Sequence, residues 1–506
     1  MSWTSAAVQR VTVVAAGALL TAFVAQSGVH LSTYLMGLII GIGIITIIAQ
    51  HPQAAVIACV AFLPLQQFLL AGLFTLGSPA SLVRDLGATK ESVTIGALLS
   101  AARLRHQHQR SRQPFDALDR AMALYAAIAT VYLIAPFGGV LGHEALSTRL
   151  LAWRADALWA VLFLTLRRLP WSPGHRRALA ITTMVTAIVV SSLAILERSS
   201  PSTWTRFVNI TLGVPHYRSV VLGAGTTLID KADFGGIAIT RAGSSFLSPI
   251  NLAFWLIIAL AVSLRYASSG GTAVLGTAAA MLSAIALVLT ETRSAIGGAV
   301  LAVAVLLLSR AGGQTKNRLR LGLLTTVAAL ALSPVVASST LGTRLFGKDV
   351  TGSQGADTSR HLQSLTSGIE ALVAHPLGHG LGTGPGVGQR YASTTRINAE
   401  NTYVGIGDEL GILAAASLVT GMILLARTSA RTRGDPAAGA MTSATIALGF
   451  TAFFLYVFVD VAVAFTFWTW AAVAVHGSAT ISRKPIGAHH PSERPMGANS
   501  AVSLTP

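Results

Sequence analysis

Charged side chains are scarce in this chain. Only 11% of its 506 residues are Asp, Glu, Lys or Arg, whereas a soluble globular protein carries about 25%. A soluble fold of this length would lack the polar groups needed to cover its surface, so the composition excludes that class. Cys59 is the one cysteine, which excludes an internal disulfide. Apolar residues make up 52% of the chain and the mean hydropathy is +0.63, which is typical of a chain whose solvent is lipid.

Long apolar runs, separated by polar segments, occupy most of the sequence. Most are close to the length of roughly 20 residues that a helix needs to cross a bilayer. A β-barrel would instead show short segments of alternating polarity. We therefore expect an all-α integral membrane protein, a polytopic bundle of about 14 transmembrane helices. The runs lie near residues 11–27, 31–49, 54–76, 80–102, 118–136, 149–166, 178–196, 246–264, 272–290, 295–309, 320–338, 402–426, 437–457 and 459–477.

The first and fourth runs differ from the others. The first resembles a signal peptide, but we see no convincing cleavage site and many spans follow, so we interpret it as a retained helix. The fourth is interrupted near its start by Arg84, Asp85, Lys90 and Glu91. We expect that element to be bent or partly re-entrant.

The net charge of +17 is concentrated in short basic loops. Arginine-rich stretches at 103–112, 167–177, 310–320 and 427–433 fall on one side of the expected topology, and the positive-inside rule makes that side cytoplasmic. Both termini then lie in the cytoplasm. The basic residues are scattered between spans without interleaved aromatics, so we expect no nucleic-acid partner.

Two long polar segments, residues 197–245 and 339–401, fall on the opposite, external side. Loops longer than about 15 residues are usually functional or disordered, and the Trp, Tyr, Phe, Gly and Pro residues in these two favour a folded external cap. The expected organisation is a membrane domain over 1–477 that carries both external loops, the second directly before the twelfth helix. A polar cytoplasmic tail over 478–506, expected to be disordered, follows.

Several arginines lie on the external side, against the charge bias. Ion pairing or solvation would account for many of them. Arg293 is different, because it sits in a tight turn between two very apolar helices, at the membrane boundary. A guanidinium binds phosphate oxygens bidentately, and a lipid diphosphate presents its phosphates at that depth. The others are Arg206, Arg218, Arg241, Arg344, Arg360, Arg390 and Arg396.

A Gly-rich segment and a short acidic motif follow one another near the end of the second external loop. The segment 375–386 contains His375 and His379 but lacks the Lys-Ser/Thr ending of a Walker loop, and a flexible connector is the alternative interpretation. Glu400 and Asn401 stand at the external end of the expected helix 402–426. Asp408 and Glu409 lie about two turns deeper, where carboxylates usually mark function, although structural pairing with an arginine is the alternative.

Four segments together resemble the O-antigen ligase and O-antigen polymerase superfamily of bacterial membrane glycosyltransferases. Their order, spacing and shared external placement carry the resemblance, which covers roughly residues 235–426. It implies a GT-C-like polytopic bundle in the bacterial plasma membrane with its active site on the external face. The segments are Arg241–Ala253, the turn Thr292–Ser294, the stretch from Ser359–Arg360 to His375–Gly382, and Asn401 with the Glu409-Leu-Gly-Ile-Leu-Ala414 sequence.

The resemblance implies transfer of a glycan from a polyprenyl-diphosphate carrier to a glycan or lipid acceptor, in contact with membrane lipids and without a metal or cofactor. Arg293 and Arg241 would bind the diphosphate. Glu400 would be the acceptor base, although the family motif has histidine at that position, so ligase and polymerase stay open. Further candidate substrate-binding residues are Arg360, Asn401, His375, His379, Tyr403 and Glu409.

Two other functions remain open at this point. A peptidoglycan-type glycan polymerase would have similar architecture, but its usual motifs are not evident. A transporter or flippase of lipid-linked glycans should carry polar residues through the middle of several helices and on both faces. Here those residues concentrate externally, which favours an enzyme.

Overall fold

The computed structural model describes residues 45–107, 115–134, 142–222, 231–234, 237–268, 270–310, 353–387, 399–432 and 434–476. The expected spans at 11–27 and 320–338, most of the span at 31–49 and the tail at 478–506 lie outside these residues. The external arginines Arg344, Arg390 and Arg396 lie outside them as well.

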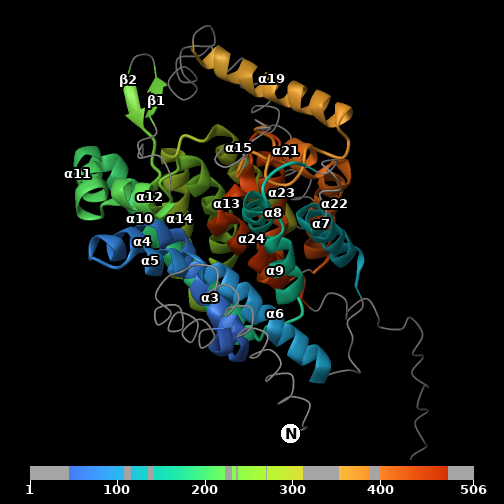
Figure 1. Cartoon of the computed structure of the whole chain (residues 1–506). Coiled ribbons are helices and arrows are strands. Elements are labelled where there is room, and N and C mark those ends of the chain that lie inside the picture. The colour runs from blue at the N-terminus through green and yellow to red at the C-terminus, as the bar shows by residue number, and fades with distance from the viewer. Residues whose placement is uncertain are drawn as a thin grey trace, which may run out of the picture.

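The described residues form a bundle of helices (Figure 1). Five helical segments within them are long and apolar enough to cross a membrane, which supports a helical membrane protein. The expected number of about fourteen is not confirmed. The five are α3–η1–α4 (Pro52–Phe62, Leu63–Leu65 and Gln66–Thr75), α7 (Ala117–Ile134), α10 (Pro173–Ser199), α13 (Pro249–Tyr266) and α22 (Ile412–Arg431).

Four further helices complete the apolar bundle. Three of them are shorter apolar helices: α14 (Ala273–Leu289), α15 (Arg293–Arg310) and α24 (Val461–Ala474). The fourth is α23 (Pro436–Thr451). Their bounds agree with the expected spans at 272–290, 295–309, 459–477 and 437–457 to within several residues.

Three spans expected as single helices are each divided in two. The fourth run is split into α5 (Ala80–Gly87) and α6 (Thr89–Gln107), as its charged start suggested. The run 149–166 is split into α8 (Leu146–Asp156) and α9 (Leu158–Leu166), where Asp156 forms a hydrogen bond with Tyr456. The expected helix 402–426 is α21 (Thr402–Leu410) followed by α22, because Gly411 adopts φ +83° and ends the first helix.

Regular structure also occurs within both expected external loops. The first contains α11 (Pro201–Arg206), the π-helical η3 (Phe207–Thr211) and α12 (Val214–Leu222). It also contains an antiparallel hairpin of β1 (Lys231–Phe234) and β2 (Ile237–Thr240), which departs from the all-α expectation. The second contains α19 (Ser353–Ala374), which lies across one end of the bundle (Figure 1).

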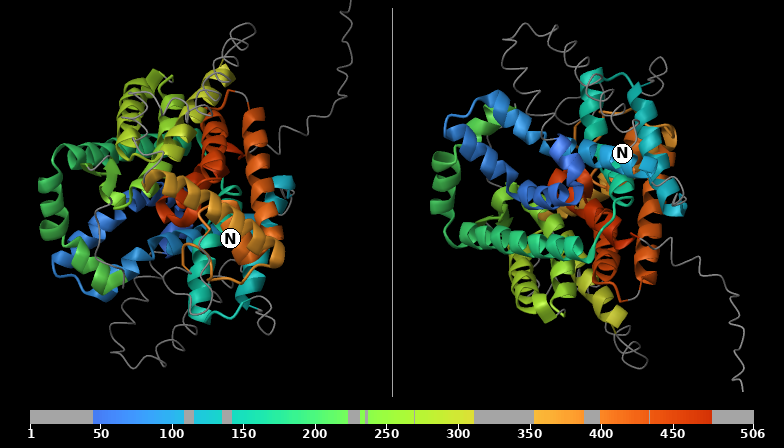
Figure 2. Two further views of the ribbon diagram at one scale, coloured as in Figure 1. Left: turned by 90° about the horizontal axis from the view of Figure 1, so that it is seen from above. Right: turned by 90° about the horizontal axis from the view of Figure 1, so that it is seen from below.

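The centre of the bundle is α13, which packs against α10, α14, α15, α23 and α24. Seventy-eight per cent of the residues in this helix are buried inside the protein, a larger share than in the other candidate spans of the described residues. Aromatic rings from α7, α9 and α24 stack within the core. The Trp159 ring stacks on Tyr125, at 4.9 Å between centroids, and on Trp468, at 4.6 Å. Figure 2 shows the first-loop helices on one side of the molecule and α22 on the other.

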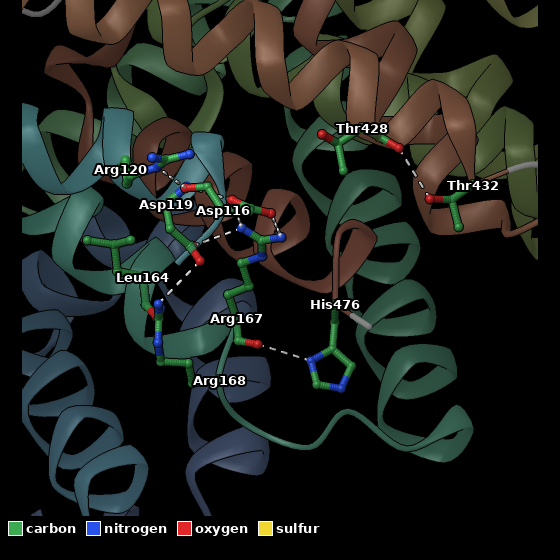
Figure 3. A network of polar contacts seen from close by, with 9 residues as sticks. All are labelled: Asp116, Asp119, Arg120, Leu164, Arg167, Arg168, Thr428, Thr432 and His476. Carbon is green, nitrogen blue, oxygen red and sulfur yellow. Dashed lines mark hydrogen bonds and ion pairs between the residues drawn. The ribbon is translucent and has the colours of Figure 1, made fainter. Parts of the chain in front are cut away.

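Ion pairs tie the helices together at the end of the bundle opposite α19. The Arg167 guanidinium contacts Asp116 Oδ1 at 2.9 Å and Asp119 Oδ1 at 2.8 Å, and Arg168 contacts Asp119 Oδ2 at 3.3 Å (Figure 3). Although burial opposes it, the Arg167 hydrogen bond lowers the pKa of Asp116. Nearby, Arg176 at the start of α10 pairs with Asp435 at 2.7 Å, just before α23.

We predict that Asp119→Ala lowers the free energy of unfolding by about 1–3 kcal/mol, because the buried Arg167 guanidinium loses one of its two carboxylate partners and keeps Asp116. Asp119 and Arg167 are each only 6% exposed at their side chains. The measurement is the thermal-unfolding midpoint in detergent. Asp85→Ala is the matched control, since Asp85 is exposed on α5 and its removal should change stability by less than about 0.5 kcal/mol. Equal midpoints for the two variants would contradict the prediction.

Candidate functional site

Arg241 and Arg293 meet at one tight turn. Arg241 follows β2, and its Nε donates to Thr290 O at 3.0 Å while Nη2 donates to Thr292 Oγ1 at 3.0 Å. These two bonds fix the plane of the guanidinium against the turn that joins α14 to α15. Arg293 is the first residue of α15, and its side chain is exposed. The structure therefore brings together the two arginines that the sequence assigned to diphosphate binding.

The backbone around this turn is strained. Three non-glycine residues in the described part of the chain have positive φ: Ser244 (50°), Leu247 (57°) and Glu291 (54°). All three lie within a few residues of Arg241 or Arg293. Such conformations cost about 1–3 kcal/mol each and cluster at functional sites. Glu291 lies in the turn itself, whereas Ser244 and Leu247 belong to the segment between Arg241 and α13.

A buried carboxylate holds the segment that carries Arg241. Glu197, near the end of α10, accepts hydrogen bonds from Gly243 N at 2.9 Å and Ser244 N at 2.6 Å. The neighbouring Arg198 lies 3.8 Å from Glu291. Burial raises the pKa of Glu291, while Arg198 and Arg241 oppose that rise. Three arginines, Arg198, Arg241 and Arg293, stand beside two glutamates, Glu197 and Glu291, so the arginines outnumber the acids at this turn.

Asn401 caps the short helix α21 at its N-terminus. Its Oδ1 accepts from Tyr403 N at 2.8 Å and Val404 N at 3.1 Å, and its Nδ2 donates to Phe453 O at 2.7 Å. The Tyr403 hydroxyl donates to Gly449 O at 3.0 Å. Both side chains thus hold α21 against the end of α23, and their assignment to substrate binding stays a prediction. Glu400, one residue earlier, is half-buried, and its N–H donates to Ser364 Oγ of α19 at 3.3 Å.

We call residues 290–293, together with Arg241, the arginine turn. The end of α23 lies between this turn and Asn401. On one side, the Thr451 hydroxyl donates to Ser294 O at 3.4 Å, directly after Arg293. On the other side, Thr402 N donates to Ala452 O at 3.0 Å, directly after Asn401. Arg293 and Glu400 therefore occupy the same end of the bundle, linked through one short stretch of backbone.

The Gly-rich segment 376–386 packs against the C-terminus of α21, so within the described residues it is not a free connector. His379 N donates to Asp408 O at 2.7 Å and Gly380 N donates to Glu409 O at 3.0 Å. These bonds satisfy carbonyls that would otherwise be unpaired at a helix end. Ile412 N donates back to Pro376 O at 3.0 Å. The loop and the break at Gly411 therefore form one unit.

Glu409 is enclosed by the same loop. Its Oε1 accepts from Gly382 N at 2.7 Å, and Gly384 N donates to the same carboxylate. Within the described residues, backbone N–H groups contact this carboxylate, and its assignment to substrate binding stays a prediction. Because the N–H groups of Gly382 and Gly384 donate to Glu409, they are not oriented to bind phosphate oxygens.

The other predicted site residues lie further from the arginine turn. His375 is exposed just after α19, and its ring lies 4.6 Å from that of His379. Both are at the C-terminal end of α21, whose nine residues span about 13 Å, whereas Glu400 is at its N-terminal end. Arg360 belongs to α19, but its side chain lies outside the described part of the chain.

Sequence reasoning missed Glu197 and Thr451. Glu197 ends an apolar run, and an acidic residue at a span end is a weak signal by itself. Thr451 stands inside the expected span 437–457, where a threonine is ordinary. Within the described residues, no three His, Cys, Asp or Glu side chains are grouped so as to hold a metal ion.

Comparison with protein families gives one match. Residues 278–419 match the family model described as O-Antigen ligase. This match supports the O-antigen ligase superfamily. It confirms the resemblance inferred from the sequence and covers Arg293, α19, the Gly-rich loop and α21, while Arg241 and α23 lie outside it. A search of curated proteins found no match.

The O-antigen ligase family and the apolar helices together indicate a transmembrane protein of envelope-glycan biosynthesis. The family suggests a membrane glycosyltransferase of ligase or polymerase type, which acts on lipid-linked glycans and acceptors in the membrane.

We predict that Gly384→Ala disrupts the loop around Glu409, because its Cβ would lie 1.8 Å from Glu409 Oε2. Relieving such an overlap costs typically about 1–3 kcal/mol, so the thermal midpoint should fall and protease cleavage within 378–387 should accelerate. Gly386→Ala is the matched control, since its Cβ would meet Val459 Cγ1 at an ordinary 3.4 Å. The enclosed-carboxylate interpretation fails if both variants resist protease as the parent protein does.

Proposed function

We propose that this protein transfers a glycan from a polyprenyl-diphosphate carrier to an acceptor hydroxyl. The observation that supports it best is the joint position of Arg241 and Arg293 on the strained turn 290–292, at the same end of the bundle as Glu400. Cations for a departing diphosphate and a carboxylate for an acceptor are the two elements that this reaction requires.

On the donor side, the bond that breaks joins the anomeric carbon to the diphosphate oxygen. Negative charge grows on that oxygen as polyprenyl diphosphate departs, and positioned guanidinium groups stabilise it. Arg241 is held by two hydrogen bonds to the turn, so its orientation is set before the carrier binds. Arg293 is exposed at the start of α15, where a lipid diphosphate can reach it. Arg360 is a third candidate.

On the acceptor side, the hydroxyl oxygen attacks the anomeric carbon and its proton passes to Glu400. The Glu400 N–H donates to Ser364 Oγ of α19, and the next residue, Asn401, caps α21, which supports a positioning role for that end of α21. Glu400 stands where the family motif has histidine, and a carboxylate can accept the proton in its place. The proposal does not choose between ligase and polymerase.

The proposed orientation places the arginine turn, α19 and α21 on the external face of the bacterial plasma membrane. The basic residues Arg167, Arg168 and Arg176 lie at the opposite end of the bundle, and the positive-inside rule supports a cytoplasmic position for them. Both termini would then be cytoplasmic.

We predict that Arg293→Ala lowers release of polyprenyl diphosphate by at least about 100-fold, with little loss of stability because the side chain is exposed. Arg293→Lys should stay at least about tenfold below the parent, since a point charge cannot reproduce the bidentate fork. The assay uses purified protein in vesicles with a polyprenyl-diphosphate-linked glycan and its acceptor. Arg206→Ala, an exposed arginine on α11, is the control. Transport of the lipid without carrier release would support a flippase instead.

We predict that Glu400→Gln lowers turnover by at least about 100-fold, because the amide keeps the shape and removes the basic oxygen. Retention of the carrier on the protein should be unchanged, since the arginine turn is untouched. Single-turnover assays with pre-bound carrier separate the two effects. Turnover near the parent value would eliminate Glu400 as the base while leaving the donor site in place.

A further inference from the structure

Helix α19 packs on α21 through one narrow face. Ser364, Leu365, Gly368 and Leu372 make up this face, which recurs at helical spacing. A Cβ at Gly368 would lie 2.5 Å from Val404 Cγ1, and one at Gly407 would lie 3.0 Å from Leu372 Cδ2. The two helices are therefore in close contact, and the inner face of α19 is already occupied.

A second face of α19 is apolar and exposed. Ile369 is 47% exposed and Val373 76%, and Leu377, just beyond the helix end, is 52% exposed. Spacing of four residues places Ile369 and Val373 on one face of the helix, and Leu377 follows in the turn directly after it. Around the helix, this apolar stripe is adjacent to the inner face, but its side chains are exposed and do not pack on α21. The remaining arc is polar and exposed, with Gln363, Thr366, Ser367 and Glu370.

The apolar stripe is continuous with the surface of a candidate membrane span. Pro376 O accepts from Ile412 N at 3.0 Å, which joins the end of the stripe to the first residue of α22. Ile412 is 51% exposed and Leu413 is 66% exposed. Since α22 is long and apolar enough to cross a membrane, its exposed apolar side chains face lipid. Larger exposed apolar patches mark interaction sites, and here the patch begins on α19 and ends on a span.

We propose that α19 lies in the membrane interface, with the stripe Ile369–Val373–Leu377 in contact with the lipid bilayer. Its inner face then rests on α21 and its polar arc faces water, so each of the three sides has a different environment. Amphipathic helices with such an arrangement lie in the interfacial plane of a bilayer. The proposal rests on the membrane location of the chain and is independent of the proposed transfer reaction.

Lipid is favoured over a second copy of the chain because the exposed apolar residues at the end of α19 adjoin those at the start of α22, which is a candidate span. A protein partner would have to cover both α19 and the lipid-facing start of a span. One consequence concerns the candidate site, since Ser364 of α19 contacts the backbone of Glu400. A helix held by the bilayer surface would keep that contact in place.

The test measures lipid contact directly. Single cysteines replace Val373, Ser367 and Leu413 in a Cys59→Ser background and carry a bimane label. The full-length protein is reconstituted in phosphatidylcholine vesicles with unmodified or brominated acyl chains. We expect brominated lipid to quench the label at position 373 at least about half as strongly as at 413, and severalfold more strongly than at 367. Iodide in the buffer should quench position 367 most.

Two outcomes would overturn the proposal. One is a label at position 373 that iodide reaches as readily as position 367. The other is protection of position 373 that appears only at high protein-to-lipid ratio, which would assign the stripe to a second copy. If the Val373→Cys protein does not fold, Ile369→Cys provides the same measurement one turn earlier on the stripe.

Discussion

The arrangement of the candidate site depends on how the short helix α21 is held at its two ends. A nine-residue helix has few internal hydrogen bonds and would be marginal on its own. At one end, Asn401 binds both the first N–H groups of the helix and the backbone of Phe453. At the other end, the Gly-rich loop binds the Asp408 and Glu409 carbonyls and encloses the Glu409 carboxylate. Glycine is needed there because a side chain at position 384 would occupy the place of that carboxylate.

The segments that carry Arg241 and Arg293 are held by different contacts. Glu291, Ser244 and Leu247 nearby in sequence have positive φ, and Glu197 accepts from two N–H groups of the segment that follows Arg241. A buried carboxylate with two backbone donors is a rigid anchor, because moving it leaves a charge unpaired. The cost of the strained turn is thus offset by contacts from α10, which is a separate element of the bundle.

The family resemblance assigned Arg241 and Arg293 to one ligand, and the structure places Arg241 against the turn directly before Arg293. The sequence also predicted most of the described helices, because long apolar runs leave few alternatives. It did not predict the break at Gly411, since a hydropathy pattern treats residues 402–426 as one run and carries no information on φ. The enclosure of Glu409 was equally hidden, because the loop that supplies the N–H groups is remote from it in sequence. The stripe on α19 was missed because Ile369 and Val373 stand among many polar residues of that helix and do not form an apolar run.

The end of α23 binds the arginine turn through Thr451 and the α21 cap through Ala452 and Phe453. Any rigid-body tilt of α23 would therefore displace the start of α15 and the α21 cap together and keep their separation. The end of α23 lies outside the residues 278–419 that match the family model. Under the proposed function, the spacing between carrier and acceptor is then a property of the bundle rather than of either motif.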